Sequence, residues 1–178
     1  MLDIDNSVII CIDIQEKLVN MLQNGESVKN NAVKLLKAAD ILGINTIITE
    51  QYPKGLGATV NEIKNIKDFK TVEKTSFSAL RTKEFEREFD KIEQENVILF
   101  GIETHICVYQ TALDHLDEGF NVYIIADCSS SRSKFNHDTA LEMLKNQGVN
   151  VVSLEMVLFE FLKTSHHPNF KEIQSLIK

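Results

Sequence analysis

A cysteine follows an apolar run at a place where an α/β protein would carry its chemistry. Residues 96–100 are predicted to form a buried strand, and residues 104–118 a helix that follows it. We expect Thr104 to be the N-cap, so that Cys107 lies in the first helical turn. Free N–H groups and the positive end of the helix dipole stabilise an anion there, which predicts a thiol that ionises more readily than a free cysteine. The same N–H groups could hold an oxyanion. The alternative is that Cys107 is a small buried hydrophobe.

Two charged residues also stand near predicted strand ends. Residues 7–14 form an apolar, β-branched run typical of a central parallel strand, and Asp13 interrupts its last residues. A buried carboxylate is costly unless it is paired or hydrogen-bonded, so Asp13 either belongs to a site or accepts hydrogen bonds from loop backbone. Lys74 follows a short predicted strand, residues 69–71, and is either solvated, as most lysines are, or part of the same site.

The other apolar patterns alternate between helical and strand spacing. This alternation predicts an α/β fold with a mostly parallel sheet, in one domain over residues 1–178. Gly43 and Gly148 are expected to end the helices that precede them. The predicted helices span residues 26–42, 84–92, 104–118, 134–147, 154–162 and 170–177, and residues 60–66 form either a short helix or an irregular segment. The predicted strands span residues 7–14, 44–49, 69–71, 96–100, 121–126 and 149–153.

Composition excludes several classes of protein. The formal net charge of −7 argues against a nucleic-acid partner, because phosphate contacts need clustered Lys and Arg. Three cysteines without close spacing give neither a disulfide framework nor a zinc pattern. The sequence shows no signal-peptide pattern and no apolar run of membrane-spanning length, which predicts a cytoplasmic protein with no membrane partner and leaves an organellar location open.

Several motifs, taken together, resemble the isochorismatase-like cysteine hydrolases, and the resemblance covers essentially the whole chain. Two further stretches, residues 49–57 and 153–160, resemble the branch that includes isochorismatase domain-containing protein 2 and YcaC. The motifs shared with the superfamily are Asp13-Ile14-Gln15, Lys74-Thr75-Ser76-Phe77-Ser78, the Gly-x-x-Thr-x-x-Cys-Val pattern of residues 101–108, Thr111-Ala112, and the loop from Asp127 to Ser131-Arg132.

The resemblance implies a three-layer, Rossmann-like fold with a six-stranded sheet, and it implies roles for particular residues. Cys107 would be the nucleophile, Asp13 the proton acceptor, and Lys74 the cation that holds both. The family carries a cis peptide that corresponds to Ile102–Glu103, and the backbone N–H groups of Glu103 and Cys107 would form the oxyanion hole. Relatives are commonly homo-oligomers, which makes a homo-oligomer the expectation here.

The chain departs from the metal-binding members of the superfamily. Nicotinamidases hold a metal with an Asp-x-His…His arrangement after the second strand, whereas residues 50–54 contain no histidine. We therefore expect no metal, no cofactor, and a substrate other than nicotinamide. The presence of Cys107 favours acyl transfer from an amide or related C–N bond of an unidentified small molecule over cleavage of a vinyl ether.

The sequence leaves other questions open. A non-catalytic binding or scaffold protein that keeps the pocket, and an isochorismate-type ether hydrolase, remain alternatives to the cysteine hydrolase. Residues 156–162 are apolar nearly all round, which predicts burial in the core or in an interface. His105 is either a pocket residue or an ordinary residue on the helix surface. The candidate pocket residues are Gln15, Tyr52, Phe77, His105 and Ser129.

Overall fold

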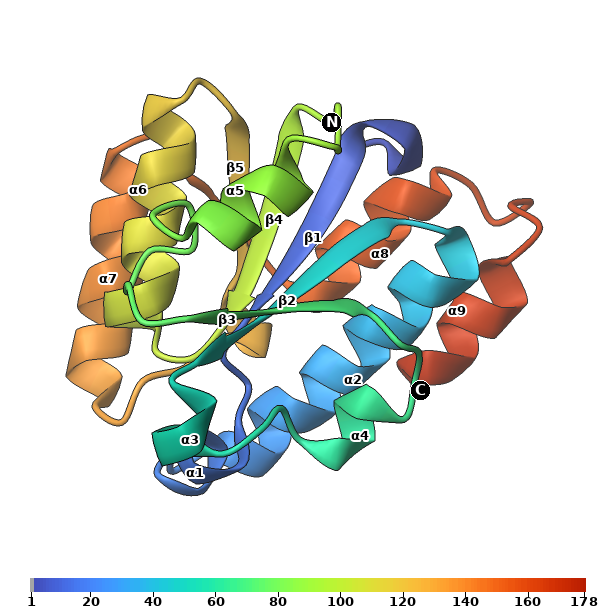
Figure 1. The fold of residues 1–178 in the computed structure, drawn as a ribbon. Coiled ribbons are helices and arrows are strands. Elements are labelled where there is room, and N and C mark those ends of the chain that lie inside the picture. Colours follow the sequence, from blue (N-terminus) through green and yellow to red (C-terminus); the bar gives the residue numbers. More distant parts are fainter. Residues whose placement is uncertain (1) are drawn as a thin grey trace.

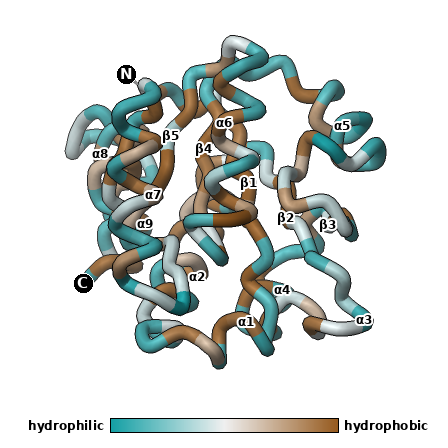
Figure 2. The backbone as a smooth tube through the Cα atoms, turned by 90° about the vertical axis from the view of Figure 1, so that its left-hand side faces the viewer, coloured by the Kyte–Doolittle hydropathy of each residue, from teal (hydrophilic) through white to brown (hydrophobic). Residues whose placement is uncertain are grey.

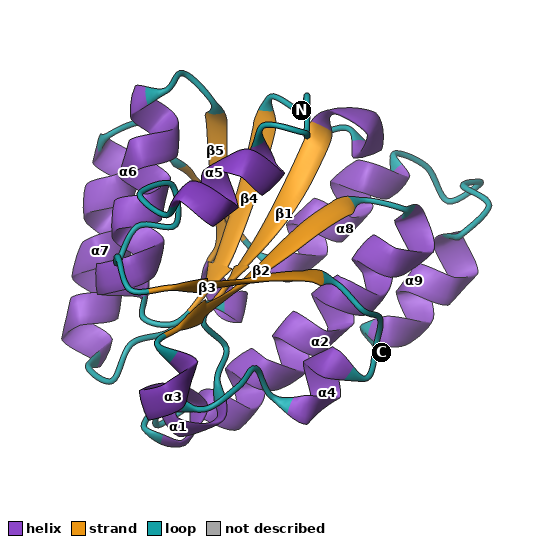
Figure 3. Cartoon of the chain, viewed as in Figure 1, coloured by secondary structure: helices purple, strands orange, loops and turns teal. Residues whose placement is uncertain are grey.

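Six strands and nine α-helices make up the computed structural model, which describes residues 2–178 (Figures 1 and 3). The strands are β1 (Ser7–Ile12), β2 (Asn45–Gln51), β3 (Lys70–Lys74), β4 (Asn96–Gly101), β5 (Asn121–Ile125) and β6 (Asn150–Val152). The α-helices are α1 (Glu16–Asn20), α2 (Gly25–Leu42), α3 (Pro53–Leu56), α4 (Asn61–Lys64), α5 (Lys83–Phe89), α6 (Tyr109–Asp117), α7 (Lys134–Asn146), α8 (Leu154–Leu162) and α9 (Phe170–Leu176). Three shorter helical turns are η1 (Ile4–Asn6), η2 (Thr104–Val108) and η3 (Ala126–Cys128).

The strands form a single parallel sheet in the order β3-β2-β1-β4-β5-β6. From β1 the chain builds outward to β3 on one side, and from β4 it builds outward to β6 on the other. The strand order therefore reverses between the neighbouring strands β1 and β4. In open α/β sheets, the crevice at the carboxyl ends of such a pair is the usual place for a ligand site.

Alternate residues of the central strands enter two different cores, because successive side chains point to opposite faces of a sheet. In β1, Ile9 and Cys11 face one core, while Ile10 and Ile12 face the other. Helices α2, α8 and α9 cover the first core, and helices α5, α6 and α7 cover the second (Figure 1). Figure 2 shows the hydrophobic strands β1, β4 and β5 lying between these helix layers. The predicted fold class, an α/β protein with a mostly parallel sheet in three layers, is confirmed.

Most predicted elements are present, with some shifted boundaries. Gly43 caps α2 at a φ of +72°, a left-handed conformation that glycine adopts without steric cost. The short strand predicted at residues 69–71 is instead β3, which continues to Lys74 and so carries this lysine as its last residue. Helix α1 was not predicted. Within α8, Val157, Leu158, Phe161 and Leu162 are buried in the core, while Met156 and Phe159 are 57% and 44% exposed, so burial of the rest of this stretch in an interface stays a prediction.

A buried histidine predicts how the stability of the fold depends on pH. His115 is fully buried, with its ring 4.9 Å from that of Phe89, and its Nε2 has no hydrogen-bond partner among residues 2–178. Burial lowers the pKa of His115 from its ordinary value of 6.5 to about 4. Between these two values the unfolded chain binds a proton that the folded chain does not, so stability falls as the pH falls. We expect His115 to cost about 2 kcal/mol of unfolding free energy between pH 7 and pH 5.

Urea unfolding at both pH values, for the wild type and for His115→Phe, measures this cost. The variant should lose about 2 kcal/mol less than the wild type on acidification, since every other titrating group is shared. Equal losses in the two proteins would show that the buried imidazole does not set this pH dependence.

Candidate active site

The three candidate catalytic residues lie where strands of the sheet end. Asp13 directly follows β1, Lys74 is the last residue of β3, and Cys107 lies in the π-helical turn η2 that follows β4. All three therefore belong to the carboxyl edge of the sheet, around the point where the strand order reverses.

Asp13 is held in place through both its backbone and its carboxylate. Its φ is +51°, which turns the chain sharply out of β1, and its N–H donates to the Thr49 carbonyl at 3.2 Å. Its side chain is fully buried. The Thr49 hydroxyl donates to Oδ1 at 2.7 Å, and Lys74 Nζ donates to Oδ2 at 2.6 Å. The buried carboxylate is thus both paired and hydrogen-bonded.

Lys74 is buried as completely as its partner. Of the ion pairs that residues 2–178 form, Asp13–Lys74 is the one with both side chains 0% exposed. Nζ also donates to Gln51 Oε1 at 2.7 Å and lies 3.2 Å from the Phe77 carbonyl and 3.4 Å from the Ser76 carbonyl. An ammonium group removed from water needs such a set of acceptors.

Cys107 lies against this ion pair. It is 7% exposed, whereas the other free cysteines, Cys11 and Cys128, are fully buried. Burial raises the pKa of the Cys107 thiol to about 12. This value also includes the interaction with Asp13, which raises the pKa, and the interaction with Lys74, which lowers it. The sulfur therefore lies close enough to the pair for both charges to act on it, and it holds its proton in the resting protein.

This geometry corrects two predictions. The thiol does not ionise more readily than a free cysteine, because burial and the neighbouring carboxylate outweigh the ammonium. Thr104 is not the N-cap, since Glu103 takes that position and the first turn is π-helical. The Thr104 hydroxyl instead lies 2.9 Å from His137 Nδ1, on α7.

The turn that carries Cys107 is anchored to the loop that follows β5. The peptide bond between Ile102 and Glu103 is cis. Glu103 Oε1 accepts hydrogen bonds from the backbone N–H and from Nε of Arg132, both at 3.0 Å, and the Thr104 N–H donates to the Ser130 carbonyl at 2.9 Å. Gly101 begins the turn at a φ of +136°, where an added Cβ would lie 2.0 Å from the Ile12 carbonyl oxygen. Any side chain at this position would collide with the end of β1.

The predicted pocket residues do not gather in one place. Gln15 is fully buried, and its side chain is hydrogen-bonded to the backbone of Gln51 and Gly57, so it fixes the backbone next to the site instead of lining a pocket. Phe77 is 53% exposed. His105 lines a small cavity of about 190 Å³ between α6 and α7. Ser129 is buried and lines a separate, larger cavity of about 540 Å³ beside the start of α2.

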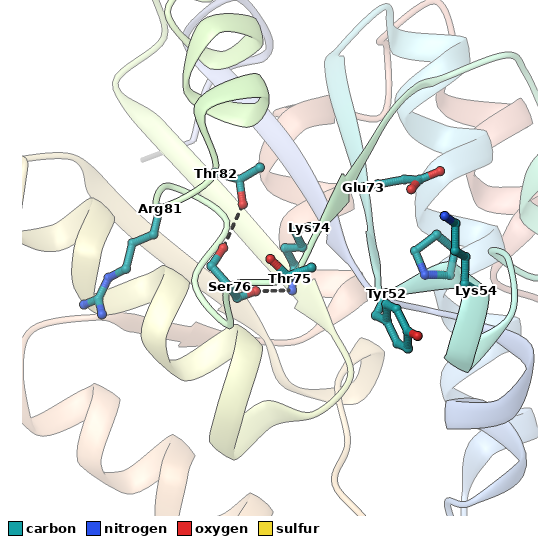
Figure 4. A pocket seen from close by; sticks show the side chains of 9 residues that line it. Tyr52, Lys54, Glu73, Lys74, Thr75, Ser76, Arg81 and Thr82 are labelled. Atoms are coloured by element: carbon teal, nitrogen blue, oxygen red, sulfur yellow. Dashed lines mark hydrogen bonds between the residues drawn. The ribbon is translucent and has the colours of Figure 1, made fainter.

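Tyr52 alone of these residues lines the cavity that Lys74 also borders. This cavity has a volume of about 440 Å³ and lies over the carboxyl end of β3 (Figure 4). Asp13 and Cys107 are not among its lining residues. Figure 4 shows Tyr52 and Lys54 on one side and Ser76, Thr82 and Arg81 on the other. The lining residues are Tyr52, Pro53, Lys54, Glu73, Lys74, Thr75, Ser76, Arg81 and Thr82.

Sequence reasoning assigned no role to two residues that contact the ion pair, Thr49 and Gln51. A signal for them exists, because Thr49 and Gln51 are two positions apart at the end of a strand and so face the same side of the sheet. Within residues 2–178, no group of three or more His, Cys, Asp or Glu side chains is placed to hold a metal ion. In the same part of the chain, no helix has the length and apolarity that a membrane crossing requires.

Comparison with known proteins adds to this geometry. The family model for the isochorismatase domain matches residues 7–156. The chain is 41% identical to isochorismatase domain-containing protein 1 of Danio rerio over 173 residues, which are 97% of this chain but only 61% of that protein. It is 38% identical to isochorismatase domain-containing protein 2 of Rattus norvegicus over 175 residues, which are 98% of this chain and 82% of that protein.

Solved structures are also similar over nearly the full length. The MAR1 ribonuclease of Caenorhabditis elegans is 36% identical with a TM-score of 0.93, over 99% of this chain and 91% of that one. YcaC of Escherichia coli, described as an octameric hydrolase of unknown specificity, is 21% identical with a TM-score of 0.88, over 98% of this chain and 94% of that one. The resemblance inferred from the sequence motifs, including its branch, agrees with these matches.

Proposed function

The chain belongs to the isochorismatase family of hydrolases, and on that premise we propose that it is a metal-independent cysteine hydrolase acting on an amide or related C–N bond of a small molecule. The observation that carries the proposal is the buried Asp13–Lys74 pair, whose two charges both act on the Cys107 thiol. An acid, a base and a nucleophile that share one buried site are the parts that acyl transfer requires.

The first half of the proposed reaction makes an acyl-enzyme. The Cys107 thiol gives its proton to Asp13 as Sγ attacks the amide carbon, and the carbonyl electron pair moves onto oxygen. The intermediate then collapses, the C–N bond breaks, and the leaving nitrogen takes the proton from Asp13. The product is a thioester on Cys107 and a free amine or ammonia. Because the pKa of the resting thiol is about 12, proton transfer to Asp13 accompanies the attack instead of preceding it.

The second half releases the acid. Asp13 takes a proton from water, the resulting hydroxide attacks the thioester carbon, and the C–S bond breaks. Sulfur recovers the proton from Asp13, which restores the starting state. Lys74 holds the Asp13 carboxylate through a hydrogen bond of 2.6 Å and offsets negative charge on sulfur.

Two further parts complete the proposal. The backbone N–H groups of Glu103 and Cys107 bind the oxyanion, in a turn held to the neighbouring loop by the contact between Glu103 and Arg132. The loop after β2 lacks histidine, and the side chain of Gln51, the last residue of β2, accepts a hydrogen bond from Lys74, which supports a reaction without a metal at that position. The octameric description of the YcaC neighbour makes a homo-oligomer the expected assembly of this chain.

Hydrolysis of a panel of small amides, read by release of ammonia or amine, tests the proposal. Cys107→Ala should keep the fold and lose all measurable hydrolysis of any amide that the wild type cleaves. Cys128→Ala is the matched control, since Cys128 is also a buried free cysteine but lies outside the site. Amide turnover retained by Cys107→Ala would contradict the mechanism. A wild type that cleaves no amide, with Cys107 inert, would favour a binding protein.

A second candidate activity comes from the Caenorhabditis elegans neighbour, whose description is a ribonuclease. The net charge of −7 opposes binding of a polyanionic RNA backbone. A labelled RNA oligonucleotide therefore belongs in the same panel, where we expect it to stay intact. Cleavage by the wild type that is lost in Cys107→Ala would assign RNA as the substrate.

A further inference from the structure

The strand β2 lies between the two strands that carry the buried ion pair. Neighbouring strands are about 4.8 Å apart, so Asp13 after β1 and Lys74 at the end of β3 start out about 10 Å apart and must meet above the end of β2. Thr49 and Gln51 of β2 are two residues apart and face the same side, toward this meeting point.

Thr49 fixes the carboxylate. Its hydroxyl donates to Asp13 Oδ1 at 2.7 Å, and its carbonyl accepts the Asp13 N–H at 3.2 Å. Both residues are 0% exposed, so no water replaces either bond if it is removed. The oxygen left for Lys74 is Oδ2, which receives Nζ at 2.6 Å.

Gln51 fixes the ammonium group. Its Oε1 accepts from Lys74 Nζ at 2.7 Å, while its Nε2 donates to the Thr75 carbonyl at 3.0 Å. The backbone of Gln51 is itself held by Gln15, whose Oε1 accepts the Gln51 N–H at 2.7 Å. This arrangement leaves the Gln51 amide one orientation, with its oxygen toward Lys74.

We propose that Thr49 and Gln51 are positioning residues that hold Asp13 and Lys74 in the geometry that Cys107 requires. The proposal rests on the proposed function of these three residues. A hydroxyl that donates to Asp13 offsets part of the negative charge that Cys107 faces, and an amide that fixes Lys74 keeps its positive charge beside the sulfur. Loss of either one should make Cys107 harder to ionise.

The rate at which iodoacetamide alkylates Cys107, measured by peptide mass spectrometry from pH 7 to pH 9, tests the proposal. The full chain is used in every case, and thermal melts confirm that each variant is folded. Thr49→Val and Gln51→Met should slow alkylation about three- to tenfold at each pH, because the thiolate fraction falls. Thr49→Ser keeps the hydroxyl and should stay within about twofold of the wild type. If Thr49→Val does not fold, Thr49→Ala carries the same expectation.

Thr59→Val is the matched control. Thr59 is 2% exposed, and its hydroxyl has no hydrogen-bond partner in the part of the chain that the structure describes, so its replacement should leave the rate unchanged. Thr49→Val and Gln51→Met proteins that react as fast as the wild type would overturn the proposal, as would slowing that Thr49→Ser does not reverse.

The alkylation rate of Cys107 in Asp13→Asn distinguishes a failure of the positioning role of Thr49 and Gln51 from a failure of the proposed function on which that role rests. Removing the Asp13 charge should accelerate alkylation, since that charge raises the pKa of Cys107. If Asp13→Asn accelerates the reaction while Thr49→Val and Gln51→Met change nothing, only the positioning role fails. If Asp13→Asn itself changes nothing, the thiol is not coupled to the ion pair and the proposed function fails with it.

Discussion

Lys74→Met is expected to lower the free energy of unfolding by about 3–5 kcal/mol, because it removes one member of a fully buried ion pair and leaves the other without a counterion. Methionine approximates the length of the lysine stem, so the change acts mainly through the lost charge. Urea unfolding at pH 7, followed by circular dichroism, measures the effect. The ion pair between Lys134 and Asp138, whose side chains are 82% and 54% exposed, serves as the comparison. Lys134→Met breaks this surface pair and should lower the free energy of unfolding by less than about 1 kcal/mol.

The double variant Asp13→Asn, Lys74→Met distinguishes charge imbalance from lost packing. With both charges removed, the site holds no uncompensated ion, and we expect the double variant to be more stable than Lys74→Met alone by about 2 kcal/mol or more. If the double variant loses the sum of the unfolding free energies that Asp13→Asn and Lys74→Met lose separately, the pair does not act as a coupled unit.

Asp13→Asn is expected to uncouple the reactivity of Cys107 from hydrolysis. In this variant Lys74 keeps its hydrogen bond to Gln51 but loses its anionic partner. The Cys107 thiol, on which the charge of Lys74 acts, becomes the group best placed to supply a negative charge. We therefore expect its pKa to fall and its alkylation at pH 7 to accelerate about tenfold or more.

Hydrolysis should change in the opposite direction. Asparagine cannot accept the thiol proton or return it to a leaving amine, so turnover of any amide substrate should fall at least about 10²-fold. Iodoacetamide labelling and amide turnover are measured on the same preparation, with Asn31→Ala, a surface change, as a control for handling. Labelling and turnover that decline together would contradict the role of Asp13 as the proton acceptor.

The fold could be predicted because its signals are local. The β-branched runs of β1 and β4 and the period of α2 identify buried strands and an amphipathic helix without reference to the rest of the chain. The alternation of these elements then restricts the topology to a parallel sheet. The end of β3 could not be placed in this way, because its alternate residues are exposed and its sequence is mostly polar.

The candidate site was predicted only in part, because its chemistry depends on tertiary contacts. Strand ends and the family resemblance together indicated that Asp13, Lys74 and Cys107 belong to one site. The direction of the Cys107 pKa shift was predicted wrongly, since a helix N-terminus and a nearby lysine are visible in the sequence while the depth of burial is not. The contacts of Thr49 and Gln51 were missed for a similar reason, because polar residues at a strand end are usually solvated.

The mass of the Cys107 peptide, after acid quench during turnover of an amide that the wild type hydrolyses, is the most direct test of the account. We predict a covalent increase equal to the acyl fragment on Cys107, with Cys11 and Cys128 unmodified. An enzyme that consumes the amide while its sulfur never carries the acyl group, even at the earliest quench times, would contradict covalent catalysis by this residue.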